Sequence, residues 1–176
     1  ELIPQKGGFG DTYEGGYVLE PKKGIHENVI CLDFSAMYPS IMVSFNISPD
    51  TVAPSGAGAE DVFVAPEVGH RFLKQPSGFF KKILTELMSR RSAIKKDMAK
   101  HERGSKEYQL LDIRQQSIKI LTNSFYGYTG WRTARWYRKE CAEATTAWGR
   151  HFVKEAMKHA EGMGFEVIYG DTDSLF

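Results

Sequence analysis

A chain of 176 residues is long enough to bury one core, and its 41% hydrophobic and 26% charged residues are ordinary proportions for a soluble globular protein. No apolar run approaches the roughly 18 residues of a membrane-spanning helix, and no basic and then apolar leader opens the chain, so we expect no membrane partner. The two cysteines, Cys31 and Cys141, are far apart and form no metal-binding pattern. This usage favours reduced thiols in an intracellular protein.

The net charge of +1 conceals an uneven distribution. Residues 79–119 contain 11 Lys or Arg against 5 Asp or Glu, whereas the rest of the chain contains 12 against 17. A basic segment beside acidic flanks suggests that a polyanion meets the first and a cation meets the second. The alternative is a long exposed helix that is rich in lysine only for solubility.

The first part of the chain predicts short strands, one helix and loops. A glycine-rich lead-in over residues 1–24 contains a short strand at 17–19. The apolar run NVICLDF, residues 28–34, predicts a strand in a buried sheet. The following YPSIMVSF places Pro39 well for the first turn of a helix. Residues 50–70, rich in Pro, Gly and Ala, predict a surface loop with one short strand.

Two long helices are predicted next, at about 78–101 and about 106–126. Gly104 would end the first helix, and Ser105 would cap the second. Because the link is short, we expect the two helices to form an antiparallel hairpin that projects from a small body.

A third helix, at about 137–163, carries apolar side chains at three- and four-residue steps, so we expect this face in the core. These side chains are Trp148, Phe152, Ala156, Met157, Ala160 and Met163. Gly162 and Gly164 would end the helix, and FEVIYG at 165–170 predicts a second buried strand. The fold class is therefore α+β, with the basic helical hairpin inserted between two sheet segments.

Three aspartates stand at the ends of the predicted strands. Asp33 ends the first, and Asp171 and Asp173 follow the second within YGDTDSLF. A lone aspartate there is usually a turn residue, but two of them two residues apart either point the same way or straddle a tight turn. A divalent cation relieves their repulsion, and hard oxygen ligands without Cys or His favour Mg²⁺ or Mn²⁺ over Zn²⁺. Three carboxylates leave room for two metal ions about 3.5–4 Å apart.

Four motifs occur in this order: YEGG (13–16), DFSAMYPSIM (33–42), KILTNSFYG (119–127) and YGDTDS (169–174). The combination closely resembles the polymerase motifs of family-B DNA polymerases, in particular those of the archaeal branch. The resemblance extends over nearly the whole chain. It implies a polymerase palm, built from an antiparallel sheet packed with helices and interrupted by a fingers hairpin.

The resemblance divides the chain into three parts. Residues 1–77 would be the first part of the palm, 78–128 the fingers, and 129–176 the second part of the palm. It also implies that a proofreading exonuclease precedes this segment in the parent protein, and that further palm strands and a thumb follow it. We therefore expect the isolated chain to be marginally stable and weak or inactive, with an exposed sheet edge where FEVIYGDTDSLF has lost its hairpin partner.

The activity implied is template-directed addition of dNMP to a primer 3′-hydroxyl with release of pyrophosphate, a reaction that depends on positioning and charge neutralisation. By resemblance, Asp33 and Asp173 would hold two Mg²⁺ ions, for which Mn²⁺ could substitute, and the Phe34 carbonyl would be a further ligand. Asp171 matches the family's other carboxylate, either as a direct ligand or as a source of local field. Lys119 would protonate the departing pyrophosphate.

The resemblance also implies a site for the incoming dNTP. Backbone amides of Ser35, Ala36 and Met37 would contact its phosphates at a helix start, although many family members have Ser and Leu at the last two positions. Tyr38 would lie under the sugar and exclude a 2′-hydroxyl; without the motif it would be read as a packed core aromatic. The other nucleotide contacts implied are Arg91 (or its neighbour Arg90), Lys95, Lys119 and Asn123. Without the motif, basic side chains on a helix would be read as a solvated face.

DNA contacts are implied at three places: beside the nascent base pair, near the template strand, and in WRTARWYRK (131–139). In the last segment aromatic and basic side chains alternate, which suits a nucleic-acid backbone, although an amphipathic strand with a wet face has the same pattern. The residues implied, place by place, are Tyr126 and Gly127, then Tyr13, Gly15 and Gly16, then Arg132 and Arg135.

Two other functions use parts of the same pattern. A two-metal nuclease or phosphatase would need the aspartates but leaves Tyr38, Asn123 and the basic hairpin without a role. A DNA-binding module that has lost catalysis would not need Asp33, Asp173 and Lys119 intact. The expected partners are primer–template DNA, dNTPs and the other domains of the parent, with a sliding clamp reached through regions outside this chain. The expected location is intracellular (cytoplasmic), and on the nucleoid if the source is archaeal.

Overall fold

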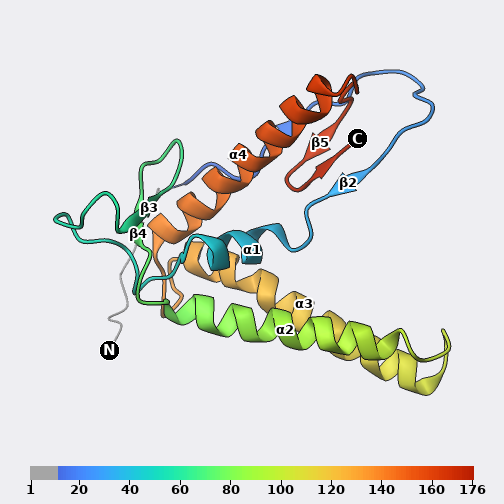
Figure 1. Ribbon diagram of the computed structural model, residues 1–176, viewed down its shortest axis with the longest axis horizontal. Helices are drawn as coiled ribbons and strands as arrows, with labels where there is room; N and C mark the ends of the chain where they lie inside the picture. Colours follow the sequence, from blue (N-terminus) through green and yellow to red (C-terminus); the bar gives the residue numbers. More distant parts are fainter. Residues whose placement is uncertain (1–11) are drawn as a thin grey trace.

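The computed structural model describes residues 12–176. Four helices form within them (Figure 1): α1 (Met37–Ser44), α2 (Phe79–Met98), α3 (Lys106–Gly130) and α4 (Lys139–Gly162). The strands are β1 (Val18–Leu19), β2 (Leu32–Asp33), β3 (Val62–Val64), β4 (Arg71–Leu73), β5 (Gly170–Asp171) and β6 (Ser174–Leu175). This combination of helices with small antiparallel sheets confirms the α+β class. None of the helices in the described range is long and apolar enough to cross a membrane.

Helices α2 and α3 form the predicted antiparallel hairpin, which points away from the rest of the molecule (Figure 1). The Ser105 hydroxyl accepts a hydrogen bond from the Tyr108 amide at 3.2 Å, so the predicted cap of α3 is confirmed. Gly104 in the link has φ 93°, a conformation that glycine adopts without strain. Helix α3 continues to Gly130, past the predicted end near 126, and the buried Thr129 anchors its last turn.

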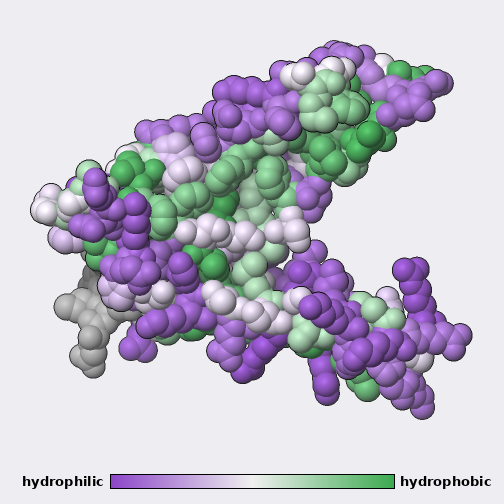
Figure 2. All heavy atoms as spheres, in the orientation of Figure 1, coloured by the Kyte–Doolittle hydropathy of each residue, from purple (hydrophilic) through white to green (hydrophobic). Residues whose placement is uncertain are grey.

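Helix α4 runs in a different direction from the hairpin, and α1 lies between them in contact with α2, α3 and α4. Figure 2 shows an opening between α4 and the α2–α3 hairpin, with hydrophilic residues covering much of the hairpin. The start of α1 and the end of β2 lie at the base of this opening (Figure 1).

The main sheet has the strand order β1-β5-β6-β2, and every neighbouring pair is antiparallel. Strands β5 and β6 form a hairpin within YGDTDSLF, extended by the Phe176 amide, which donates to the Tyr169 carbonyl at 2.9 Å. The expectation that FEVIYGDTDSLF has lost its hairpin partner and leaves an exposed edge is therefore wrong, because the segment forms a hairpin with itself and lies between β1 and β2. Because the chain reverses at this turn, the Asp33 strand lies beside β6 rather than beside β5.

The predictions of buried strands at 28–34 and 165–170 are largely wrong. Of residues 28–34 only Leu32–Asp33 form a strand, and of 165–170 only Gly170 belongs to one. The side chain of Leu32 is 58% exposed. The apolar runs have the composition of buried strands, but their side chains line an open hollow rather than a closed core.

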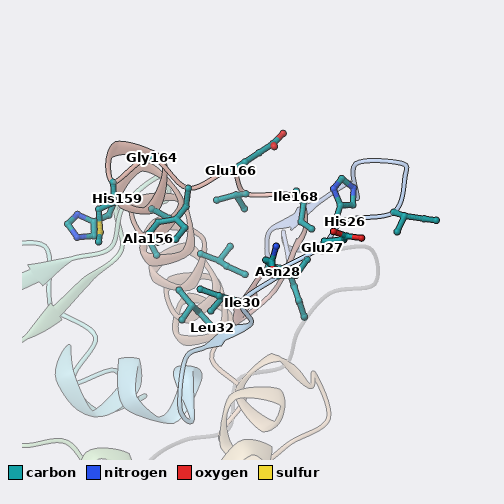
Figure 3. Close-up of a pocket in the computed structure, with 18 residues that line it drawn as sticks. His26, Glu27, Asn28, Ile30, Leu32, Ala156, His159, Gly164, Glu166 and Ile168 are labelled. Atoms are coloured by element: carbon teal, nitrogen blue, oxygen red, sulfur yellow. The ribbon is translucent and has the colours of Figure 1, made fainter.

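This hollow has a volume of about 750 Å³ and lies between segment 25–32 and the C-terminal end of α4. Figure 3 shows Ile30 and Leu32 on one side of it and Ala156 of α4 on another. Met163, predicted to lie in the core, is 64% exposed at its rim. That prediction is wrong because the C-terminal end of α4 extends beyond the elements that pack against the rest of the helix.

The core gathers buried side chains from α1, the start of α2 and α4. The ring of Phe45, just after α1, stacks on Trp148 with centroids 3.8 Å apart and planes 6° from parallel, as the predicted apolar face of α4 requires. The most buried side of α4 consists instead of small side chains, which the spacing of large apolar residues did not reveal. Its fully buried members include Cys141, Ala142, Ala144, Ala147 and Val153.

A buried arginine on α4 joins three segments. The Arg150 side chain is 3% exposed, and its Nε donates to Glu67 Oε2 at 2.7 Å. Its Nη1 donates to the backbone carbonyls of Glu14 at 3.0 Å and Gly15 at 2.8 Å. Lys154 adds an ion pair to Glu67 at 3.1 Å. The network fastens the YEGG segment to α4.

The stability of the chain is expected to fall at acid pH through Glu67. Burial would raise the pKa of Glu67, but hydrogen bonds from Arg150 and Lys154 outweigh it and hold the pKa below its ordinary value of 4.5. A depressed folded-state pKa contributes stability that is present above the unfolded-state pKa and is lost as the pH falls through the folded-state value. Urea unfolding below about pH 4.5 should therefore show a steeper loss for the wild type than for Glu67→Gln. Equal pH slopes for the two proteins would contradict this assignment.

Candidate active site

Asp171 and Asp173 straddle the tight turn between β5 and β6. The Asp173 amide donates to the Asp171 carbonyl at 2.6 Å. Thr172, between them, has φ 55°, an uncommon left-handed conformation for a β-branched residue. The Thr172 amide donates to the Tyr17 carbonyl at 2.8 Å. The segment before β1 therefore holds the turn in this conformation.

Strand β2 brings Asp33 beside Asp173. The Phe34 amide donates to the Asp173 carbonyl at 2.8 Å, and Asp33 pairs with Ser174 in the ladder. Burial raises the pKa of Asp173, the negative charge of Asp33 raises it further, and the Lys119 ammonium opposes both. Two carboxylates and a lysine from α3 thus share one electrostatic environment.

These groups surround a cavity of about 330 Å³ at the meeting point of β2, α1, α2, α3 and the β5–β6 turn. It has carboxylates on one side and basic or amide side chains on the other. The residues that line it are Asp33, Phe34, Ser35, Ala36, Met37, Tyr38, Pro39, Arg91, Lys119, Thr122, Asn123 and Asp173. The larger apolar hollow lies apart from all of them.

The wall from β2 to α1 contains a strained residue. Ala36, the N-cap of α1, has φ 50° and ψ 49° and supplies no capping side chain. A non-glycine residue in this conformation costs about 1–2 kcal/mol. Such strain is found preferentially at functional sites. The first-turn amides of α1 therefore have no side-chain cap from this position and lie at the cavity wall.

Three tyrosines pack in series behind the cavity. The ring centroids of Tyr38 and Tyr126 are 4.5 Å apart, and the Tyr13 hydroxyl donates to the Tyr126 hydroxyl at 3.2 Å. Burial raises the pKa of Tyr38, and the charge of Asp173 raises it further. Burial likewise raises the pKa of Tyr126, together with its hydrogen bond to Tyr13. The Tyr38 and Tyr126 hydroxyls therefore stay protonated.

The basic wall comes from the hairpin. Arg91 lines the cavity, and its Nε donates to Gln115 Oε1 at 3.1 Å. The neighbouring Arg90 pairs instead with Glu86 on the exposed side of α2. Lys95 is exposed and does not line the cavity. Of the two adjacent arginines, Arg91 has the position that a ligand in the cavity could reach.

The carboxylates at the cavity are the groups that could bind a metal ion. Asp33 and Asp173 converge at the cavity edge, whereas Asp171 accepts hydrogen bonds from the Thr172 hydroxyl at 2.8 Å and the Tyr169 hydroxyl at 3.3 Å. Between residues 12 and 176 no three His, Cys, Asp or Glu side chains form a metal-binding group. Mg²⁺ is commonly held by one or two carboxylates and completed by water and substrate phosphates. Two mutually repelling carboxylates fit that requirement.

The residues implied in DNA binding occupy several positions. Gly16 lies against Thr172, and Gly15 is exposed. Gly127 is exposed on α3. Segment 131–139 contains no strand, so its reading as an amphipathic strand is wrong. Within that segment Arg132 is half-buried, whereas Arg135 is exposed with its guanidinium 5.7 Å from the Trp136 ring centroid.

Two further contributors carry no chemical signal in the sequence. Thr122 lines the cavity, but its hydroxyl bonds to the carbonyls of Ile118 and Lys119 in its own helix. Gly149 of α4 lies against the Tyr38 ring. A glycine inside a helical pattern was the one available hint, since it often has a packing reason.

Gly16→Ala is expected to destabilise the chain by about 1–3 kcal/mol, the usual cost of overpacking. A β-carbon at this position would lie 2.9 Å from Thr172 Cγ2 and 3.2 Å from Thr172 Cα. Gly15→Ala is the matched control, because a β-carbon there meets no atom within 4 Å. Adding Thr172→Gly to Gly16→Ala removes the side-chain contacts and leaves only the approach to the Cα of residue 172, so it should recover most of the loss in the urea midpoint. Equal losses for the two single variants would contradict the contact.

Comparison with known proteins shows a consistent relationship. A family model described as DNA polymerase family B matches residues 2–176. The chain is 57% identical over its whole length to a DNA polymerase of Archaeoglobus fulgidus and 54% identical to DNA polymerase 2 of Aeropyrum pernix, and it covers 22% of each. The structure of the family B DNA polymerase from Pyrobaculum calidifontis superposes with a TM-score of 0.81 at 46% identity, over 98% of this chain and 23% of that one. The chain thus spans about a fifth of the length of these relatives.

Proposed function

Because this chain belongs to DNA polymerase family B, we propose that it provides the catalytic centre of a DNA-directed DNA polymerase. The reaction is template-directed addition of dNMP to a primer 3′-hydroxyl, with pyrophosphate as the leaving group. The observation that carries the proposal is the convergence of Asp33 and Asp173 with Arg91 and Lys119 on one cavity. The nuclease alternative is not favoured, because it leaves the basic wall and Tyr38 without a role.

The proposed cofactor is a pair of Mg²⁺ ions, replaceable by Mn²⁺. Asp33, Asp173 and the Phe34 carbonyl would hold them, with Asp171 as a neighbouring carboxylate. When bound, the ions would lower the pKa of the primer hydroxyl and neutralise charge on the phosphates. The aspartates themselves keep negative charge fixed at one edge of the cavity.

The opposite wall is proposed to bind the triphosphate. Arg91 and Lys119 would contact its phosphates, and Lys119 would donate a proton to the departing pyrophosphate. Lys95 lies one turn further along α2, outside the cavity lining, and would reach the phosphates if the hairpin moved toward the cavity when substrate binds. Asn123 would contact the nucleotide, and the start of α1, at Ser35, Ala36 and Met37, would offer backbone amides.

The remaining assignments concern the sugar and the DNA. Tyr38 would lie under the sugar, and the hairpin would act as the fingers above a palm formed by the flanking segments. Primer–template DNA, dNTPs and the other domains of a longer parent protein are the proposed partners, in an intracellular setting. The DNA-facing residues proposed are Tyr13, Gly15, Gly16, Tyr126, Gly127, Arg132 and Arg135.

The test is a chimera in which this chain replaces the corresponding span of the Archaeoglobus fulgidus DNA polymerase, to which it is 57% identical. We expect primer extension that requires a template, dNTPs and Mg²⁺. Release of nucleotides without dNTPs would favour a nuclease. A folded chimera that binds DNA but does not extend a primer would overturn the proposal.

A further inference from the structure

We propose that Gly149 on α4 is a positioning residue for Tyr38 and thereby sets the choice between deoxyribose and ribose. This inference rests on the proposed function, because it concerns the sugar of the incoming nucleotide. Glycine in the interior of a helix is destabilising relative to alanine. Its presence in the interior of α4 therefore calls for a compensating contact.

The contact is with the Tyr38 ring. A β-carbon at position 149 would lie 3.1 Å from Tyr38 Cε1 and 3.2 Å from Met37 Cε. Both separations are shorter than the optimum of about 3.5–4.0 Å for two carbon atoms. The methionine side chain is flexible and can yield. The tyrosine ring is rigid, so the main effect of a methyl group at 149 falls on Tyr38.

The ring cannot simply withdraw from such a methyl group. Tyr126 packs against it at 4.5 Å, and the Tyr13 hydroxyl holds the Tyr126 hydroxyl at 3.2 Å. Tyr13 in turn lies against Gly130, where a β-carbon would approach its ring carbon Cζ to 3.1 Å. The Tyr38 ring is therefore enclosed by α4 and α3, and the cavity that it lines is the open direction.

A displacement of the ring by a few tenths of an ångström would thus occur in the space where the sugar is proposed to lie. The contact between ring and deoxyribose depends on close fit, and one methylene in such a pocket changes selectivity by about 10–200-fold. Under the proposed role of Tyr38 a ribonucleotide would already be excluded, so its binding would change less than that of the dNTP. The preference for dNTP over NTP should consequently fall.

The experiment uses the chimera and measures kcat/KM for a dNTP and for the matching NTP. Gly149→Ala should lower the dNTP preference about tenfold, with the change mainly in KM for the dNTP. The matched control is Gly162→Ala at the end of the same helix, where a β-carbon meets no atom within 4 Å. This control should keep the wild-type preference.

A double variant separates positioning of Tyr38 from a general packing role. In a Tyr38→Ala background no ring remains to be displaced, so adding Gly149→Ala should change the NTP-to-dNTP ratio no further. If Gly149→Ala alone does not fold, the double variant with Tyr38→Ala is tested for a cooperative melting transition. A double variant that folds supports the contact, and one that also fails to fold overturns the proposal.

The outcomes distinguish the two levels of inference. A wild-type chimera that extends primers, combined with equal sugar preference for Gly149→Ala and Gly162→Ala, would overturn the role of Gly149 and leave the proposed function intact. Additive effects of Gly149→Ala and Tyr38→Ala would also overturn it. A folded wild-type chimera that does not extend primers would count against the proposed function itself.

Discussion

Asp173→Asn in the chimera is expected to lower the rate of nucleotide addition by about a thousandfold or more, which corresponds to about 4 kcal/mol of transition-state stabilisation. The substitution keeps the size of the side chain and its place beside β6, but it removes a charge that faces Asp33 and Lys119. Only the Asp33 carboxylate then remains of the pair, so the affinity of the site for a divalent cation falls steeply. Single-turnover primer extension over a range of Mg²⁺ concentrations measures the loss.

Two controls make this test specific. Asp97→Asn changes an exposed aspartate that pairs with Lys100 near the tip of the hairpin, and it should leave the rate unchanged. Asp171→Asn should cost less than Asp173→Asn, because Asp171 bonds to Thr172 and Tyr169 outside the cavity lining. A rate for Asp173→Asn within tenfold of the wild type would remove the aspartate pair from the proposed mechanism.

Arg150→Met is expected to destabilise the chain by about 3–5 kcal/mol, because removal of one partner from a buried ion pair leaves the other polar groups uncompensated. The groups affected are the Glu67 carboxylate and the carbonyls of Glu14 and Gly15. The methionine fills much of the volume, so the loss reports the polar network rather than a cavity. A folded domain has about 5–15 kcal/mol in total, and a loss of this size would leave a large unfolded fraction. Urea unfolding followed by circular dichroism measures it.

Lys154→Met is the matched control for this experiment. Lys154 pairs with the same Glu67, but its side chain is 44% exposed, and exposed pairs contribute about 1 kcal/mol or less. Combining Arg150→Met with Glu67→Gln should cost less than the sum of the two single changes, since the unpaired carboxylate is gone. Similar losses for Arg150→Met and Lys154→Met would show that the buried network does not anchor the YEGG segment.

Sequence patterns predicted the helical part of the fold well. The hairpin was predictable because Gly104 and Ser105 act locally, through a left-handed turn and a cap. The short strands were not, because a strand depends on partners distant in the chain. The apolar run at 28–34 has the composition of a buried strand, yet most of it lines an open hollow. Composition reports what a segment can bury, not what covers it.

In the candidate site, too, some residues could be predicted from the sequence and others could not. Asp33, Asp173 and Lys119 were predictable because their motifs carry chemical groups, and the structure gathers them at one cavity. Gly149 was not predictable as a neighbour of Tyr38, because a residue without a side chain shows its role only through what approaches it. The contact of Gly16 with Thr172 was hidden for the same reason.

The order of strands in the main sheet has a consequence for how the protein folds. Helices α2 and α3 are neighbours in sequence, so their hairpin can form from local contacts, whereas β2 and β6 come from opposite ends of the chain. Closing so long a loop is entropically costly and slow, and folding rates fall as contacts become less local. Asp33 and Asp173 should therefore come together late in folding, after the α2–α3 hairpin has formed. Pulsed hydrogen exchange during refolding would then protect amides of α2 and α3 before the amide of Phe34.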